Sequence, residues 1–251
     1  MLKNIYKKLV PLKIRLDVYY LLFKIRYLFY IGSEFECNCC GKKIRKFLDY
    51  GIVKRHNAAC PYCYSLERNR LLWLFLNNNN LLNKETKLLH FAPERIIEQK
   101  IKKLKLKSYI SADIDPQLAD VVVDITNINF PDNSFNLIIC SHVLAHIKDE
   151  AKAIQELYRV LSTGGIALIM TRIDLSLNAT YEETDVDTSN KRLKYYKQED
   201  VFRIHAKDFN KRLEQSGFNV EVLDYASELG TKISNYYSLG KNEWIYKCSK
   251  L

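Results

Sequence analysis

Short apolar segments alternate with amphipathic ones from residue 87 onward, and this alternation limits the possible folds more than any other feature of the chain. KLLHF, SYISADI, VVVDI, FNLIICS and IALIMT have the length and apolar character of strands. PERIIEQKIKKL and DEAKAIQELYRVL have apolar residues at helical spacing, and the TGG after the second is expected to end that helix. Strands that alternate with helices indicate parallel βαβ units and a doubly wound α/β sheet.

Two closing strands are expected after this alternating region. AKDFNKRLEQSG has the pattern of a helix that ends at Gly217, and FNVEVLDY and EWIYKCS have the alternating faces of strands. Residues 173–200 are polar and charged, with no clear period. A segment of that length is long for a loop inside a compact domain, so we expect it to be mobile or functional.

Two C-x-x-C pairs in the first quarter of the chain indicate a metal site. The pairs are Cys37 with Cys40 and Cys60 with Cys63, and nineteen residues separate them. Two such knuckles can present four thiolates to one tetrahedral zinc. Because sulfur would fill every ligand position, we expect the zinc to be structural. The remaining cysteines are predicted to be a free thiol at Cys39 and core residues at Cys140 and Cys248.

Residues 1–35 are basic and aromatic, and after Pro11 they have the pattern of a helix. The basic residues interspersed in this helix are Lys13, Arg15, Lys24 and Arg26. We favour a terminal helix that packs on the main domain. The alternative is an interfacial helix through which residues 1–32 contact an anionic membrane. No run of about 18 uninterrupted apolar residues and no signal-peptide pattern are evident, so we expect a cytoplasmic protein, at most at the inner face of the membrane.

The net charge of +10 permits nucleic acid, anionic lipid or a phosphorylated substrate as a partner and does not choose among them. The basic residues are spread through the chain, which makes nucleic acid the less expected partner. A helix is predicted at SLERNRLLWLFLNNN, with Ser65 as its N-cap. We therefore predict a helical segment at 1–35, a zinc-ribbon-like subdomain at 36–66 and a main domain at 67–251, with 173–200 on its substrate side.

Polar residues follow several of the predicted strands. Asp113 and Asp115 follow SYISA, Asp124 follows VVV, and Ser141 and His142 end the next strand. In a doubly wound sheet, ligands bind at the carboxyl ends of the strands near the point where the strand order reverses. Turn chemistry alone is the alternative for each residue, but their recurrence at successive strand ends favours a ligand site.

The turn LLHFAPER, which follows the first of these strands, contains no glycine. Dinucleotide-binding sheets place glycines at this turn so that the backbone can approach a pyrophosphate. A ligand without a pyrophosphate does not need them. The turn therefore argues against a dinucleotide cofactor.

The run DITNINFPDNSFNLIICSHVLAHIKDEAKAIQELYRVLSTGGIALIM resembles the class I S-adenosylmethionine-dependent methyltransferases, of the methyltransferase type 11 kind. CPYCYSLERNR and LLHFAPE are similar to one branch of that family, in which two cysteine knuckles come first and HFAPE replaces the glycine loop. The resemblance spans roughly residue 36 to the end of the chain. It implies a Rossmann-like, seven-stranded sheet behind a small zinc-ribbon-like subdomain, with S-adenosylmethionine as cofactor and S-adenosylhomocysteine as product.

The resemblance also implies site residues. Asp113 would hold the ribose hydroxyls, Asp124 the adenine amino group, and Glu94 the ammonium of the amino-acid tail. The full set of implied cofactor contacts is His90, Ala92, Pro93, Glu94, Asp113, Ile114, Asp124, Ile125 and Ser141, with Arg68 as a candidate for the carboxylate.

For transfer to a hydroxyl, His142 and His146 are the candidate bases, and both would face the cleft if HVLAH begins a helix. For an anionic acceptor, Arg172 and Arg203 would orient the substrate.

Three departures from the branch concern the substrate side. Ala145 stands where Glu is usual, and His205 and Ala206 stand where Tyr and Gly are usual. We expect methyl transfer to an oxygen of a small molecule or surface-polysaccharide precursor, either a sugar hydroxyl or a phosphate or carboxylate oxygen. The alternatives are a zinc-ribbon protein that binds or methylates RNA, and a methyltransferase scaffold that has lost catalysis.

Overall fold

The computed structural model describes residues 10–51, 54–241 and 243–251, so residues 1–9 of the predicted N-terminal segment lie outside the described part. The chain forms two compact units. Unit 1 runs to Asn78 and also includes Glu94–Lys100 and Ala226–Gly240. Unit 2 comprises Asn79–Pro93, Ile101–Tyr225 and Lys241–Leu251. The domain boundaries at residues 35/36 and 66/67 stay predictions.

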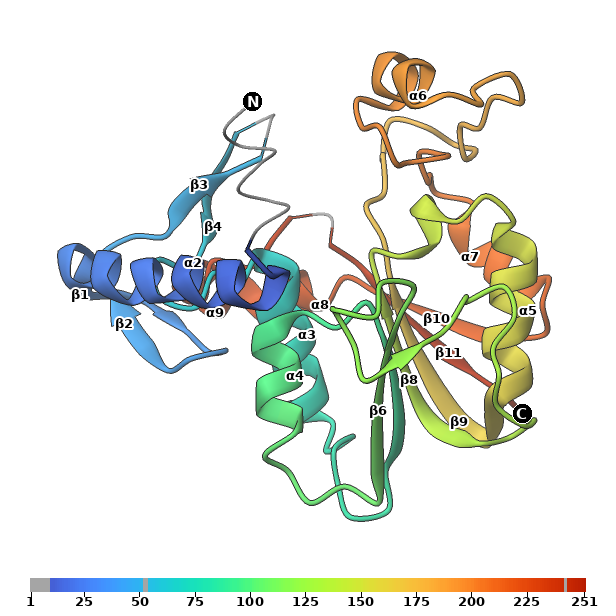
Figure 1. The fold of residues 1–251 in the computed structure, drawn as a ribbon, viewed down its shortest axis with the longest axis horizontal. Coiled ribbons are helices and arrows are strands. Elements are labelled where there is room, and N and C mark those ends of the chain that lie inside the picture. Colours follow the sequence, from blue (N-terminus) through green and yellow to red (C-terminus); the bar gives the residue numbers. More distant parts are fainter. Residues whose placement is uncertain (1–9, 52–53, 242) are drawn as a thin grey trace. The chain divides into compact units, whose positions relative to one another are not determined.

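Unit 2 is built on a seven-stranded sheet in the order β10-β11-β9-β8-β5-β6-β7 (Figure 1). Strand β11 runs antiparallel to both of its neighbours, and the other pairings are parallel. This confirms the predicted Rossmann-like, mostly parallel sheet. The strands are β5 (Lys87–Phe91), β6 (Ser108–Asp113), β7 (Val121–Val122), β8 (Phe135–Ser141), β9 (Leu161–Met170), β10 (Asn219–Leu223) and β11 (Ile245–Ser249).

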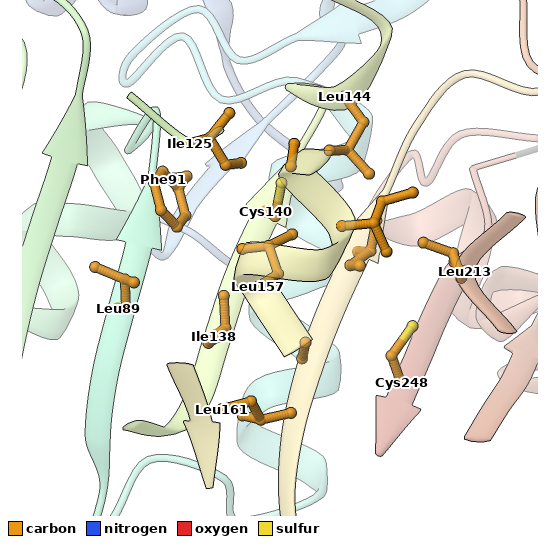
Figure 2. Close-up of a cluster of buried hydrophobic side chains, with 14 of the residues drawn as sticks. Leu89, Phe91, Ile125, Ile138, Cys140, Leu144, Leu157, Leu161, Leu213 and Cys248 are labelled. Atoms are coloured by element: carbon orange, nitrogen blue, oxygen red, sulfur yellow. The ribbon is translucent and has the colours of Figure 1, made fainter. Parts of the chain in front are cut away.

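Helices α5 (Glu150–Val160) and α7 (Phe209–Glu214) lie on the same side of this sheet (Figure 1). Leu157 of α5 and Leu213 of α7 join Leu89 and Ile138 of the strands in one buried apolar cluster (Figure 2). Each large aliphatic side chain buried in this way contributes about 1.5–3 kcal/mol to folding. Two predicted core cysteines, Cys140 and Cys248, are in the same cluster (Figure 2).

The prediction that TGG ends α5 is wrong. The helix ends at Val160 and β9 begins at once with Leu161, so the glycines lie inside the strand. The pairing of β8 with β9 shifts register here, and Gly164 has φ +75°. A side chain at Gly165 would meet Ser162 O at 2.8 Å. The two glycines therefore permit a bulge in β9 rather than a helix end.

The prediction that Gly217 is the C-cap of its helix is wrong, because α7 ends at Glu214 and its C-cap is Gln215. The φ of Gly217 is +99°, and a Cβ at this position would lie 3.0 Å from the ring of Tyr158. Both the left-handed backbone and the close ring favour glycine here.

The polar segment 173–200 is folded. It contains α6 (Ser189–Tyr196), whose N-cap Thr188 accepts a hydrogen bond from Lys191 N–H. Isolated bridges join Ile173 to His205 and Tyr181 to Ile204, and Val186, Tyr196 and Val201 form a small buried cluster. Figure 1 shows the segment as a lobe beyond the carboxyl end of β9. Its role beside the substrate stays a prediction.

Unit 1 combines helices with two short antiparallel hairpins. The predicted helix after Pro11 is confirmed as α2 (Leu12–Tyr27), and it runs into the 3-10 helix η1 (Leu28–Tyr30). The remaining elements are β1 (Ile31–Cys37), β2 (Lys42–Ile44), β3 (Leu48–Tyr50), β4 (Arg55–Ala59), α3 (Glu67–Asn78), α4 (Arg95–Ile101) and α9 (Gly230–Tyr236), while α8 (Tyr225–Glu228) crosses from one unit to the other. None of the helices in the described part of the chain has the length and apolar character needed to cross a membrane.

Arg70 of α3 holds unit 1 together from inside. It is 0 % exposed, and its guanidinium lies 4.1 Å from the ring centroid of Phe47. The guanidinium donates to four backbone carbonyls, those of Ala58, Ser65, Tyr237 and Ser238. A buried charge needs such partners, so this arginine of the SLERNR motif has a structural explanation.

Candidate active site and metal centre

The four predicted metal ligands converge in unit 1. The sulfur atoms of Cys37, Cys40, Cys60 and Cys63 all lie within 4.8 Å of one another. The Cys37–Cys63 separation is 3.6 Å and the Cys40–Cys60 separation is 3.8 Å. Tetrahedral zinc with Zn–S bonds of about 2.3 Å requires sulfur–sulfur distances of about 3.8 Å. The quartet therefore fits a structural zinc of four thiolates.

Tight turns shape both knuckles. Gly41, with φ +70°, donates from its N–H to Cys37 O, and the N–H groups of Tyr62 and Cys63 point at Cys60 Sγ, at 3.4 and 3.5 Å. Such donors offset the charge of a thiolate. Cys39 is buried and outside the quartet, as predicted.

Ser65 does not occupy the predicted N-cap position, because α3 begins at Glu67, two residues later. Its hydroxyl oxygen instead lies 3.1 Å from Cys37 Sγ and 3.3 Å from Cys63 Sγ. Ser65 thus supports the cysteine quartet rather than the helix.

In unit 2 the strand order reverses between β5 and β8, because the chain continues from β5 to β6 on one side and from β8 to β9 on the other. The residues directly after these two strands, Ala92 and His142, have φ values of +45° and +57°. Their N–H groups donate to Ala112 O and Met170 O, at 2.9 and 2.7 Å. Left-handed backbone is uncommon for residues other than glycine, and it clusters at functional sites. The turn without glycine thus adopts a conformation that favours glycine.

The two predicted carboxylates lie at strand ends in the same sheet. Asp113 ends β6 and accepts through Oδ1 from Asp115 N–H at 2.9 Å. Asp124, after β7, accepts through Oδ1 from both the N–H and the hydroxyl of Thr126, at 2.8 Å each. In the described part of the chain, Oδ2 of neither aspartate accepts a hydrogen bond, so both carboxylates retain capacity for a ligand.

The neighbouring predicted contacts differ in exposure. Ile114 is 69 % exposed, which is unusual for an isoleucine, whereas Ile125 is 3 % exposed and its side chain lies in the core. Ser141 and His90 are buried, and His90 Nδ1 lies 3.2 Å from Tyr109 Oη. The side chain of Ile125 therefore belongs to the core.

Two predicted cofactor contacts belong to unit 1. Arg68 Nε lies 3.7 Å from Glu94 Oε1, and Asn69 donates to the same oxygen at 2.8 Å. Arg68 and Glu94 are both largely shielded from solvent. The pair offers one positive and one negative group side by side.

HVLAH does not begin a helix, so the predicted one-turn spacing of His142 and His146 is wrong. Only Leu144–His146 form a turn of 3-10 helix, and the left-handed backbone of His142 lies outside it. His142 Nε2 lies 3.0 Å from Glu243 Oε2. Glu243 is the first residue of the predicted strand segment EWIYKCS, but the sequence did not suggest it as a partner of His142. His146 Nδ1 lies 3.1 Å from Asp200 O. A carboxylate partner orients the imidazole ring.

The two predicted substrate arginines have different surroundings. Arg172 is exposed, directly beyond the end of β9 and Thr171. Arg203 is 2 % exposed. It pairs with Glu182 at 2.8 Å and donates to three backbone carbonyls, those of Leu144, Ile147 and Lys148. These contacts hold the segment around His146. Substrate binding by either arginine stays a prediction.

A buried polar network that the sequence did not reveal surrounds Arg203. His205 Nε2 lies 2.5 Å from Glu150 Oε1, and His205 Nδ1 lies 2.8 Å from the hydroxyl of Thr171. Arg212 donates to Glu150 Oε2 at 2.6 Å. Burial lowers the pKa of His205, an effect that Glu150 partly offsets. Burial alone would raise the pKa of Glu150, but His205 and the nearby arginines lower it overall.

Comparison with known proteins gives a family match for the part of unit 2 that contains strands β5 to β9. Residues 87–169 match the family model described as a methyltransferase domain. A search of curated proteins gave no match. Two solved structures resemble the chain at TM-scores of 0.52 and 0.51.

The first of these structures is the (4+2)-cyclase SpnF, which is 15 % identical; the match covers 71 % of this chain and 80 % of that one. The second is an S-adenosylmethionine-dependent methyltransferase from Mesorhizobium loti, which is 13 % identical; the match covers 71 % of this chain and 97 % of that one. At such identities the likeness shows the fold. Residues 87–169 therefore match a methyltransferase domain, and the chain has the Rossmann-like class I fold that S-adenosylmethionine-dependent methyltransferases share.

Proposed function

We propose that this chain transfers a methyl group from S-adenosylmethionine to an oxygen atom of a small molecule. The observation that carries the proposal is the group of polar strand ends in unit 2. Left-handed turns at Ala92 and His142 flank the point where the strand order reverses, and Asp113 and Asp124 follow the next strands with one carboxylate oxygen each left for a ligand. A doubly wound sheet binds its ligand at this edge.

The nucleoside part of the cofactor matches these groups in chemistry. Asp113 accepts from the ribose hydroxyls, Asp124 accepts from the adenine amino group, and exposed Ile114 offers an apolar surface to the flat base. Ala92, Pro93, Ser141 and His90 complete the set inferred from the resemblance, and Ile125 contributes its backbone.

The amino-acid tail of the cofactor is a zwitterion. The Arg68–Glu94 pair of unit 1 presents both complementary charges in a largely shielded setting. The resemblance assigns the ammonium to Glu94 and the carboxylate to Arg68. A pyrophosphate would be repelled by Glu94, which agrees with a turn that lacks phosphate-binding glycines.

Methyl transfer is an in-line displacement. The acceptor oxygen forms a bond to the methyl carbon, the carbon–sulfur bond breaks, and its electron pair neutralises the sulfonium. A hydroxyl acceptor must also lose its proton, which His142 takes while Glu243 holds the imidazole. His146 is the second candidate base. A phosphate or carboxylate acceptor needs no base, and exposed Arg172 would orient it by paired hydrogen bonds.

The zinc quartet has no part in this displacement, because four thiolates leave no coordination position for a substrate. Its contribution is to fix the two hairpins of unit 1. The assignment of the acceptor as a sugar or a surface-polysaccharide precursor is supported by the resemblance of CPYCYSLERNR and LLHFAPE to one branch of the family.

A degenerate scaffold is the second candidate, since Ala145 replaces a usual glutamate and one structure with this fold is a cyclase. The contacts of Ala145 argue against the view that the missing glutamate reflects only a loss of catalysis. Its side chain packs on the cluster of Val186, Tyr196 and Val201, and its carbonyl accepts from Phe202 N–H at 2.9 Å. A glutamate would not fit this apolar contact without burying its charge. The small residue is thus explained by the folded segment beyond β9.

Calorimetric titration with S-adenosylmethionine and S-adenosylhomocysteine tests the cofactor assignment, and we expect both to bind. Transfer of labelled methyl groups is then measured with sugars, sugar phosphates, carboxylates and RNA. Labelled sugar or phosphate-bearing product supports the proposal, labelled RNA supports the RNA alternative, and binding without transfer to any class supports the scaffold. Absence of binding would refute the proposal.

A further inference from the structure

Helix α2 has two apolar faces of different character. The face that packs on the rest of unit 1 is aromatic. Phe23 is 6 % exposed and packs with Leu48 and Leu66. Tyr27 meets Tyr62 edge to face at 5.3 Å between ring centroids. This face shows that α2 packs on neighbouring elements of unit 1, and these contacts lie in the predicted zinc-ribbon-like segment rather than in the predicted main domain.

The opposite face is aliphatic and exposed. Its large side chains lie at the spacing of one helical stripe, which η1 continues. They are Ile14, Val18, Leu21, Leu22, Ile25, Leu28 and Phe29, and each is between 47 % and 71 % exposed. Single exposed apolar side chains are ordinary, but a contiguous stripe of this length marks an interaction surface. Packing within unit 1 does not account for it.

Cations gather at the end of this stripe. Arg26, Arg45 and Lys46 are all exposed, and their charged groups lie 5.9, 5.7 and 5.9 Å from the ring centroid of Tyr30. In the described part of the chain none of the three forms an ion pair. The acidic residue of α2, Asp17, is already paired with Arg95 at 2.6 Å. Among the described residues, the cations at the end of the stripe therefore have no ion-pair partner.

A hollow adjoins the same cluster. Its volume is about 870 Å³, and Leu22, Arg26, Tyr30 and Lys46 are among the residues that line it. An apolar stripe beside cations, aromatic rings and a hollow matches a layer in which acyl chains lie next to phosphate groups. A second copy of the chain that met this face with its own copy of the face would bring the same cations to it.

We infer that the outer face of α2 and η1 docks on the surface of a bilayer that contains anionic phospholipid. The aliphatic stripe lies among the acyl chains near the headgroups, and Arg26, Arg45 and Lys46 contact lipid phosphates. Tyr30 holds the cations together at the level of the headgroups. This inference is independent of the proposed methyl transfer, because it uses no residue of the cofactor or acceptor site.

Co-sedimentation of the full chain with vesicles tests the inference. Vesicles of phosphatidylcholine alone are compared with vesicles that also contain phosphatidylglycerol, at low and high salt. We expect binding to the anionic vesicles that weakens as salt rises. The double variant Arg45→Gln/Lys46→Gln should bind about 30-fold more weakly, the loss expected for two cations near an anionic surface. The matched control Lys103→Gln/Lys105→Gln, in unit 2, should bind as the parent does.

The apolar stripe is tested with Leu21→Ser/Ile25→Ser against Leu193→Ser, an exposed leucine of α6. Only the first should abolish sedimentation, and circular dichroism with zinc analysis confirms that each variant is folded. If the first variant unfolds, the charge variants and the salt dependence of the parent decide. Parent protein that stays in solution with anionic vesicles would overturn the inference. So would equal losses in variants and controls, or a self-association that Leu21→Ser/Ile25→Ser abolishes.

Discussion

Replacing Glu150 by glutamine tests whether the buried network stabilises unit 2. The carboxylate is 1 % exposed. It lies 2.5 Å from His205 Nε2 and 2.6 Å from Arg212 Nε. Glutamine keeps the shape and removes the charge. Removal of one partner from a buried ion pair destabilises a protein by about 3–5 kcal/mol.

The lower end of that range is expected here. Arg203 and Arg212 would still have Glu182, at 2.8 and 3.4 Å, so neither arginine becomes an isolated charge. We therefore expect Glu150→Gln to lower the free energy of unfolding by about 3 kcal/mol. Urea unfolding followed by circular dichroism measures this change, with an unchanged slope as the sign that the unfolded state is the same. Glu221→Gln, which removes the surface pair with Lys247, is the control and should have little effect.

The pH dependence gives a second readout. The pKa of His205 lies below its ordinary value of 6.5 because of burial, so the unfolded chain takes up the proton first and stability falls as pH drops below 6.5. The pKa of Glu150 is also lowered, from 4.5, so its contribution is present above pH 4.5 and is lost on further acidification. The variant should lack the second decline. A loss of less than about 1 kcal/mol, or an unchanged acid limb, would refute this account of the network.

Three further predictions concern the cofactor, the metal and the base. Glu94→Ala should weaken S-adenosylmethionine binding by about 30-fold in calorimetry, because the ammonium of the cofactor loses the carboxylate proposed to bind it, whereas Glu98→Ala one turn later should change it little; similar losses would contradict the role of Glu94. Cys60→Ser, or removal of zinc by a chelator, should unfold the hairpins of unit 1 cooperatively in thermal scans, and a zinc content of zero in the folded parent would contradict the quartet. His142→Gln should lower kcat for a hydroxyl acceptor by about 100-fold without changing cofactor affinity, and an unaltered pH–rate profile would exclude it as the base.

The sheet and the helix α5 were predictable because apolar residues recur along the sequence at the spacing of strands and helices. The apolar period of α5 and the continuous apolar strands on either side of it need no tertiary information. The glycines of TGG were misassigned for a physical reason. A glycine with positive φ serves a helix end and a strand bulge equally well, and only the register of β8 against β9 separates them.

The candidate site was predictable where a residue follows a strand and not where its partner is distant. The positions of Asp113 and Asp124 after strands were predictable because strand ends can be located, while their contact with a ligand stays a prediction. His142 and its partner Glu243 are 101 positions apart in the sequence, and His205 and its partner Glu150 are 55 positions apart. No local sequence pattern predicts such distant pairs. The folded state of residues 173–200 was missed because α6 is rich in lysine and tyrosine, which hide its apolar period.

The turn after β5 shows the limit of residue type as a guide to backbone conformation. Glycine is favoured where φ is positive because a Cβ costs about 1–2 kcal/mol there, and LLHFAPER contains no glycine. Ala92 nevertheless has φ +45°, fixed by its hydrogen bond to Ala112 O. His142 bears the same strain at the end of the adjacent strand β8, fixed by Met170 O. Strain on both sides of the point where the strand order reverses supports the cofactor site proposed at this edge of the sheet.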